Sequence, residues 1–199
     1  MGRGQGGEKA PGTEPVAAVP MGGRDEILLE RDVDAIEIPS GSPITLPAGA
    51  RVRVTQALGG SYTVLVDDWF LARLEDADAA DLGLPPAAAA AAPLDAPLEE
   101  QVWAQLRTCY DPEIPANIVD LGLIYGCRVV SLADGRSRVE VSLTLTAPGC
   151  GMGDVLCDDI RRKLRSLPAV AEAEVEVVLD PPWDPGRMSE AARLQLGLL

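Results

Sequence analysis

The 199-residue sequence contains no histidine. Histidine is the side chain that most often moves protons near neutral pH, and it is a common zinc ligand. Its absence excludes a Ser-His-Asp triad, a Cys-His pair and a histidine-based zinc site. Any nucleophile in this chain must therefore be activated by another group.

Long apolar runs and an excess of basic residues are absent too. No apolar stretch approaches the roughly 20 residues of a membrane-spanning helix. Residues 1–24, rich in Gly and Pro, lack the apolar core of a secretory signal, and we expect a disordered tail. Lys and Arg number 17 against 31 Asp and Glu, for a net charge of -14. Because this charge repels phosphates and anionic lipids, we expect binding to neither nucleic acid nor membranes. Without a secretory signal, the reducing cytoplasm is the expected compartment.

The four cysteines form no C-x-x-C pair, so a zinc ribbon or a local redox dithiol has no support. They are Cys109, Cys127, Cys150 and Cys157. Cys157 lies on the apolar stripe of a predicted helix, and Cys109 and Cys127 lie near the edges of a predicted helix and strand. Since free cysteine is commonly buried, we expect these three to be core residues.

The composition of the sequence changes abruptly near its middle. Residues 84–97 contain Pro85-Pro86, six alanines and Pro93. An alanine run this short between prolines cannot nucleate a helix, so we interpret residues 84–97 as a linker. It separates residues 25–83, which we expect to form a small β-rich domain, from a second domain at residues 98–199.

The first predicted domain has the pattern of antiparallel hairpins. Valines alternate with polar residues over 51–55, Gly59-Gly60 turns the chain, and apolar residues alternate again over 62–66. We expect Trp69 and Phe70 to pack in its core, although an exposed pair would make a binding patch. Its polar residues are scattered along the sequence and indicate no catalytic site.

The second predicted domain follows a different pattern. Apolar residues at helical spacing predict helices over 94–109 and 154–167, and alternation predicts strands over 123–131, 137–146 and 171–179. A strand, helix, strand order implies a right-handed parallel crossover. The expected fold is α/β (α+β), a small two-layer sandwich with a mixed sheet and two helices on one face, preceded by a small all-β domain.

Cys150 differs from the other cysteines because it lies in a glycine-rich loop between a predicted strand and a predicted helix. Unpaired N–H groups at a helix start favour a thiolate and lower its pKa from ~8.5. Gly149 and Gly151 let the backbone approach a bound group. Asp154 opposes this effect, but we expect it to point into solvent. A plain loop cysteine is the alternative interpretation.

Other residues could share a site with Cys150 if the fold is as predicted. Glu113 in an acidic, proline-rich loop, and Thr144 or Thr146 at a strand end, would meet it at one end of the sheet. A carboxylate, a hydroxyl and a thiolate suit a metal ion or a transferred cluster. One thiolate is too few to hold a cluster, which implies shared ligation with a partner or in a homodimer. Trp183, between prolines, belongs either to this site or to a hydrophobic lid.

The loops of the second domain carry three distinctive segments: DPEIPANIVDLGLIY (111–125), SLTLTAPGCGMGD (142–154) and DPPWDPGRMSEAARLQLG (180–197). Together they resemble the SufT-type family of iron–sulfur cluster-assembly domains, also called DUF59. TLPAG (45–49) and TQALGGSYTV (55–64) resemble the extra N-terminal domain of bacterial members. Gly151 departs from the family, in which proline is usual, and should loosen the loop. The absence of cysteine after Cys157 argues against the PaaD subtype.

The resemblance implies a function in iron–sulfur protein maturation, as an assembly or transfer factor and not as an enzyme. It implies assembly machinery and client apoproteins as partners, and transient iron or a transient cluster as the only cofactor. Cys150 would be the functional thiol and a transient or shared metal ligand. The residues expected to line the site are Asp111, Glu113, Thr144, Thr146, Gly149, Gly151 and Trp183.

Two other hypotheses stay open. In the first, Cys150 is the nucleophile of a thiol enzyme and Glu113 is its general base, although the lack of histidine weakens this hypothesis. In the second, the chain is an adaptor that binds a partner through Trp69 and Phe70, and Cys150 is only structural.

Overall fold

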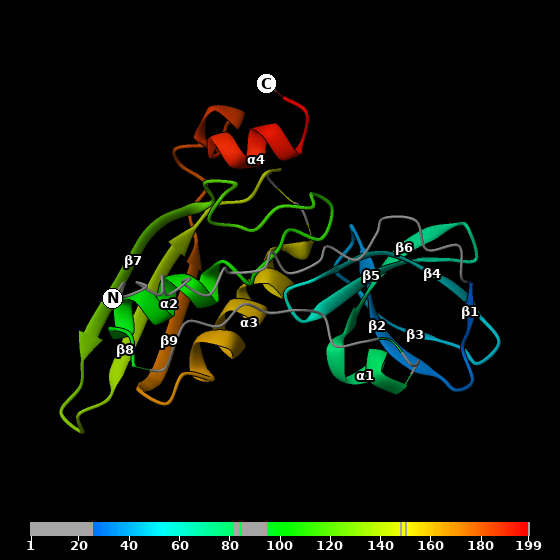
Figure 1. Cartoon of the computed structure of the whole chain (residues 1–199), viewed down its shortest axis with the longest axis horizontal. Helices are drawn as coiled ribbons and strands as arrows, with labels where there is room; N and C mark the ends of the chain where they lie inside the picture. The colour runs from blue at the N-terminus through cyan, green and yellow to red at the C-terminus, as the bar shows by residue number, and fades with distance from the viewer. Residues whose placement is uncertain (1–25, 82–83, 85–94, 148, 150, 199) are drawn as a thin grey trace, which may run out of the picture.

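The computed structural model describes residues 26–81, 84, 95–147, 149 and 151–198, which form two units (Figure 1). The N-terminal unit comprises β1 to α1 and the C-terminal unit comprises α2 to α4. Each unit has its own hydrophobic core. The predicted tail and most of the predicted linker lie outside the described residues.

The N-terminal unit is a six-stranded antiparallel sheet in the order β1-β4-β5-β6-β2-β3. Its strands are β1 (Ile27–Leu28), β2 (Val33–Ile38), β3 (Pro43–Leu46), β4 (Arg51–Leu58), β5 (Ser61–Val66) and β6 (Phe70–Glu75). A short helix that the sequence pattern did not predict, α1 (Asp76–Asp81), follows β6. The prediction of a β-rich first unit is confirmed.

Trp69 does not pack in the core, contrary to the prediction. Val66 pairs with Phe70, so Trp69 belongs to the turn between β5 and β6 and lies outside the strand pairing. Asp67 and Asp68 make this turn with positive φ angles of 47° and 59°. As a result Trp69 is 87% exposed, whereas Phe70 packs against the N-terminal core as predicted.

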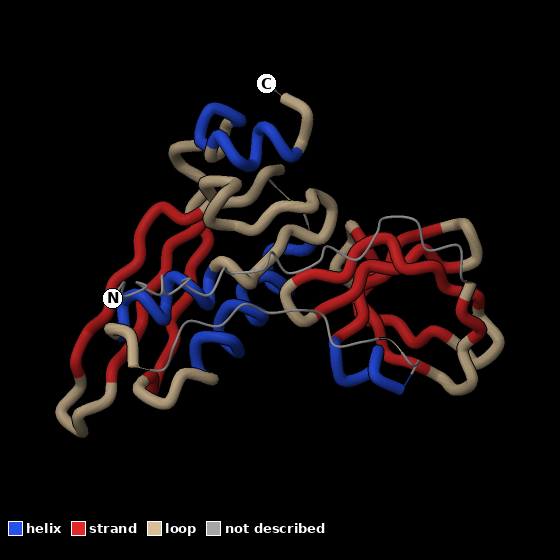
Figure 2. The backbone as a smooth tube through the Cα atoms, in the orientation of Figure 1, coloured by secondary structure: helices blue, strands red, loops and turns tan. Residues whose placement is uncertain are grey.

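The C-terminal unit is a two-layer arrangement of a mixed sheet and helices, which confirms the predicted fold class. The sheet has β7 (Ile124–Ser131) antiparallel to β8 (Ser137–Leu143), and β8 parallel to β9 (Val170–Val177). Helices α2 (Leu98–Leu106) and α3 (Met152–Arg165) cover one face (Figure 2). A 3-10 turn η1 (Pro185–Arg187) and α4 (Glu190–Gln195) follow β9 and were not predicted.

Alternating side chains join this sheet to α3. Val139, Val141 and Leu143 of β8 are buried on the helical side of the sheet, and Ile160 and Leu164 of α3 lie in the same core. Each fully buried side chain of this size contributes about 1.5 to 3 kcal/mol. This packing fixes α3 against the sheet. No helix among the described residues is long and apolar enough to cross a membrane.

Candidate functional site

The first two of the three distinctive segments meet at the end of the C-terminal sheet where β8 and β9 finish. Ile124 at the start of β7 pairs with Leu143 at the end of β8. The backbone N–H of Thr144 donates to the oxygen of Leu123 at 2.9 Å, and that of Val178 donates to Leu143 at 2.7 Å. The third segment, which begins at Asp180, therefore leaves the sheet at the same end where the other two segments meet.

The third segment folds back onto the first. The indole N–H of half-buried Trp183 donates to the backbone oxygen of Leu121 at 2.8 Å. The hydroxyl of Tyr125 donates to the backbone oxygen of Pro181, also at 2.8 Å. The guanidinium of Arg187 lies over the Tyr125 ring, 4.2 Å from its centroid. Trp183 is thus held against the first segment by a hydrogen bond.

Asp111 organises the start of the first segment. One of its carboxylate oxygens accepts hydrogen bonds from the N–H groups of Glu113 and Ile114, each at 2.9 Å. Asp111 is 8% exposed, and this burial raises the pKa of its carboxyl, although the two N–H groups act in the opposite direction. The Glu113 side chain is exposed.

We expect Asp111→Asn to leave the free energy of unfolding at pH 7 unchanged or raised, because the amide oxygen can still accept both hydrogen bonds without a buried charge. Asp111→Ala should lower it by about 1 to 2 kcal/mol, since two N–H groups lose their acceptor. Because burial raises the folded-state pKa of Asp111, ionisation of the wild-type carboxyl lowers the free energy of unfolding as pH rises through that pKa. Urea unfolding at pH 4 and pH 7 measures this. A lower stability of Asp111→Asn at pH 7 would contradict the prediction.

The remaining predicted site residues lie on the stretch that enters α3. Thr144 is buried, Thr146 is half-buried, and Gly149 and Gly151 are exposed. Gly151 is the N-cap of α3 and has no side chain that could accept from the first N–H groups of the helix. Cys150 itself lies outside the described residues. Among those that are described, no hydrogen bond or ion pair joins the Glu113 side chain to Thr144, Thr146 or Trp183.

Three thiols belong to the C-terminal core, as predicted. Cys109 and Cys157 are buried, and half-buried Cys127 packs against the same hydrophobic core. Burial raises the pKa of Cys109 to about 12, and burial with nearby Glu99 raises that of Cys127 to about 11. Burial also raises the pKa of Cys157. These thiols are neutral at physiological pH, and no group of three metal-binding side chains occurs among the described residues.

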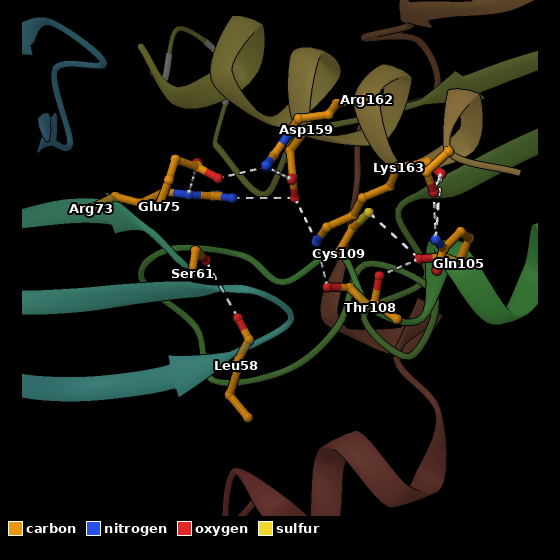
Figure 3. Close-up of polar contacts among 11 residues, drawn as sticks. Leu58, Ser61, Arg73, Glu75, Gln105, Thr108, Cys109, Asp159, Arg162 and Lys163 are labelled. Atoms are coloured by element: carbon orange, nitrogen blue, oxygen red, sulfur yellow. Dashed lines mark hydrogen bonds and ion pairs between the residues drawn. The ribbon is translucent and has the colours of Figure 1, made fainter. Parts of the chain in front are cut away.

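A charged cluster between the two units was missed by the sequence analysis (Figure 3). Asp159 on α3, 3% exposed, lies 3.2 Å from the guanidinium of Arg73 on β6, which is 4% exposed. Its carboxylate also pairs with Lys163 at 2.9 Å and Arg162 at 2.5 Å. Glu75 on β6 pairs with Arg162 at 2.7 Å. The cluster joins the N-terminal sheet to the helix that follows the Cys150 loop.

Burial alone would raise the pKa of Asp159, but the three surrounding cations hold it below its ordinary value. Lys163 also donates to the backbone oxygen of Thr108 at 2.7 Å, so the cluster reaches the end of α2. One signal was present in the sequence, because Asp159 is next to Ile160 at the edge of the apolar stripe. No pattern marks Arg73 as its partner.

The sequence of the C-terminal unit matches the family described as "Iron-sulfur cluster assembly protein" over residues 99–177. The chain is 46% identical over 101 residues to an Fe-S protein maturation auxiliary factor of Porphyromonas gingivalis, covering 92% of that protein and 51% of this chain. The chain belongs to the iron–sulfur cluster assembly family. The SufT-type resemblance is therefore confirmed.

Other members of this family match between 44% and 51% of the chain. YitW of Bacillus subtilis, another Fe-S protein maturation auxiliary factor, is 34% identical over 101 residues, with 95% of its length and 51% of this chain covered. SufT of Staphylococcus aureus is 38% identical over 88 residues, with 96% of its length and 44% of this chain covered. A crystal structure of a DUF59 domain from Bacillus anthracis aligns with 51% of this chain and 93% of its own, at 35% identity and a TM-score of 0.44.

Proposed function

We propose that this protein assists the maturation of iron–sulfur proteins and hands iron or a cluster to client apoproteins through the Cys150 thiolate. The match to maturation factors over nearly their whole length carries this proposal. The proposed partners are the assembly machinery and its clients, and the proposed compartment is the cytoplasm. We also propose that the two units are separate domains joined by residues 84–97.

The choice of Cys150 is supported by what the other thiols do. Cys109, Cys127 and Cys157 are core residues whose pKa values are raised. Cys150 precedes Gly151, the N-cap of α3, whose first N–H groups favour an anion. Asp154 is exposed as expected, so water weakens its repulsion of a thiolate.

In this proposal the iron–sulfur cluster is transferred to a client and is not a resident cofactor. Because the described residues offer no set of three metal-binding side chains, we infer that ligands come from a client or a second copy of the chain. Transfer is a ligand exchange: a client thiolate forms a bond to iron as the bond between iron and Cys150 breaks. No oxidant or reductant is needed. The chain acts here as an auxiliary factor and not as an enzyme.

Anaerobic maturation of an apo iron–sulfur enzyme tests this function. We expect Cys150→Ser to reduce client activation to the rate seen without the protein. Cys127→Ser is the matched control and should keep the wild-type rate, because a neutral, half-buried thiol is a poor ligand. Full client activation by Cys150→Ser would refute the proposed role of Cys150.

The adaptor hypothesis gains one observation, the 87% exposure of Trp69. If Trp69→Ala abolishes client activation while Cys150→Ser does not, the adaptor function is the correct one. No observation on the described residues favours the thiol-enzyme hypothesis. It would require turnover of a small substrate that Glu113→Gln abolishes.

A further inference from the structure

Strand β9 lies at one edge of the C-terminal sheet, where it pairs with β8 alone among the described residues (Figure 1). The backbone N–H of Val178, just after the strand, donates to Leu143 of β8. Because successive residues of a strand direct their backbone groups to opposite edges, Ala173, Val175 and Val177 direct theirs away from β8. These three residues therefore present N–H and C=O groups along the free edge of β9.

The described part of the chain covers this edge only in part. The guanidinium of Arg161 on α3 donates to the backbone oxygen of Val175 at 2.7 Å. No other hydrogen bond among the described residues reaches the backbone of Ala173, Val175 or Val177 from this side. At the end of β9 Val177 is 36% exposed, and Leu179 beyond it is 53% exposed. A single guanidinium protects less of an edge than a bulge, a proline or a covering helix does.

The side chains of β9 alternate between acidic and apolar residues. Three glutamates are exposed on the face opposite the helices: Glu172, Glu174 and Glu176. Between them, Ala173 and Val175 are buried in the core. A strand added to the free edge would place its own side chains beside these two sets, on the same two faces of the sheet. The edge therefore favours a strand that alternates in the complementary way.

One cation of the described chain pairs with these glutamates. Glu174 has Arg138 at 3.6 Å, and no ion pair among the described residues joins a cation to Glu172 or Glu176. Beside them the face is hollowed to about 450 Å³, over a lining that includes Ser142, Glu174 and Glu176. This hollow has room for the long side chain of a lysine or an arginine. Charge and space therefore both fit a basic segment.

A second copy of this chain does not fit the free edge of β9. Pairing β9 with another β9 would place glutamates beside glutamates on the same face, which destabilises a sheet. The glutamates thus prevent self-pairing, as charged residues on edge strands commonly do, and leave the edge open to a strand of opposite charge.

We propose that the free edge of β9 is a docking site for an extended segment of a partner protein, in which lysine or arginine alternates with apolar residues. The segment adds a fourth strand to the sheet. Its basic side chains lie beside the three glutamates, and its apolar side chains extend the core beyond Val175 and Val177. Backbone hydrogen bonds supply affinity and alternate side chains supply specificity. The docking site does not depend on the proposed function of Cys150.

A synthetic peptide tests this docking site on the full chain. It has eight residues, the length of β9, alternates lysine and valine, and is blocked at both ends. The control peptide has the same sequence with every backbone nitrogen methylated, so it cannot donate hydrogen bonds to the edge. Isothermal titration calorimetry measures the binding of both peptides.

We expect the wild-type protein to bind the lysine–valine peptide and not its methylated form. Replacing Glu172, Glu174 and Glu176 together by glutamine should weaken binding about tenfold, because three cross-strand ion pairs are lost. The matched control makes the same change of net charge at exposed positions outside β9 and should weaken binding less than about twofold. It combines Glu30→Gln, Glu99→Gln and Glu100→Gln.

Hydrogen exchange locates the contact on the strand. When the peptide is bound, the amides of Ala173, Val175 and Val177 should exchange about tenfold more slowly, because the added strand accepts from these N–H groups. The amides of the glutamates between them should change less, since they already face β8.

Absence of binding at about 1 mM peptide would overturn the proposal, and the glutamates would then serve only to prevent self-pairing. Equal binding of the methylated peptide would overturn it as well. So would equal losses in the two triple variants, or unchanged exchange of the three edge amides. None of these outcomes bears on whether Cys150→Ser activates clients.

Discussion

Replacing Asp159 with alanine is expected to lower the free energy of unfolding by about 3 to 5 kcal/mol, the usual cost of removing one partner of a buried ion pair. The variant leaves Arg73 buried, with Glu75 at 3.5 Å as its remaining ion-pair partner among the described residues. It also removes the carboxylate shared by Lys163 and Arg162. Urea unfolding at pH 7 measures the loss.

Replacing Arg73, the cationic partner of Asp159, should lower the free energy of unfolding less. Arg73→Met leaves Asp159 with two cations and fills much of the vacated volume, so we expect a loss of about 1 to 2 kcal/mol. Arg53→Ala is the control, since its pair with Asp68 at 3.0 Å is exposed and should be worth less than about 1 kcal/mol. An equal loss in Arg73→Met and Asp159→Ala would contradict the shared-carboxylate arrangement.

The loss of unfolding free energy in Asp159→Ala should depend on pH. The surrounding cations hold the folded-state pKa of Asp159 below its ordinary value. Its contribution is therefore complete above the unfolded-state pKa of about 3.9 and disappears as pH falls through the folded-state pKa. The difference between wild type and Asp159→Ala should be largest at neutral pH and shrink in acid. A deficit that grows in acid would show that the charge of Asp159 is not what stabilises the protein.

Gly122→Ala is expected to lower the free energy of unfolding by about 3 kcal/mol or more, from left-handed strain and a backbone clash together. Gly122 has φ +71°, and an added Cβ would lie 2.3 Å from the backbone oxygen of Arg187. The first and third segments would have to separate. Thermal unfolding and protease cleavage after β9 would both detect the change.

Gly197→Ala provides the matched comparison for Gly122→Ala. Gly197 has φ +69° but no neighbour within 4 Å of an added Cβ, so only the strain of about 1 kcal/mol applies. If both variants lose the same stability, the contact between Gly122 and Arg187 is not important for holding the C-terminal segment.

Strands and long helices could be predicted from the sequence because their side chains alternate or repeat against a core. β8 was recognisable from Val139 to Leu143, and α3 from its apolar stripe. The short helices α1 and α4 have six residues each, too few to show a period. A cap could have revealed α4, because the hydroxyl of Ser189 accepts from the N–H of Ala192.

Contacts between the two units could not be predicted, because each depends on how separately folded surfaces meet. Arg73 sits between two buried residues of β6, and nothing in the strand pattern indicates a partner on α3. Gly151 illustrates the same limit. Its φ of -62° would suit the proline that the family resemblance suggests, yet any Cβ there would meet the oxygen of Ser40. Of the candidate site, the meeting of the first two segments at one end of the sheet followed from the predicted fold.

Helix α3 packs on the C-terminal sheet and is joined to β6 of the N-terminal unit by ion pairs, and this has a consequence for how its sequence can vary. Seven of its fourteen residues are buried, including Asp159 on the side that faces the N-terminal unit. Four positions remain exposed: Asp154, Asp158, Arg162 and Arg165. They follow one another at intervals of three or four residues along a single narrow strip. Because Arg162 pairs with Asp159 and Glu75, random mutagenesis of this helix should recover tolerated changes chiefly at Asp154, Asp158 and Arg165.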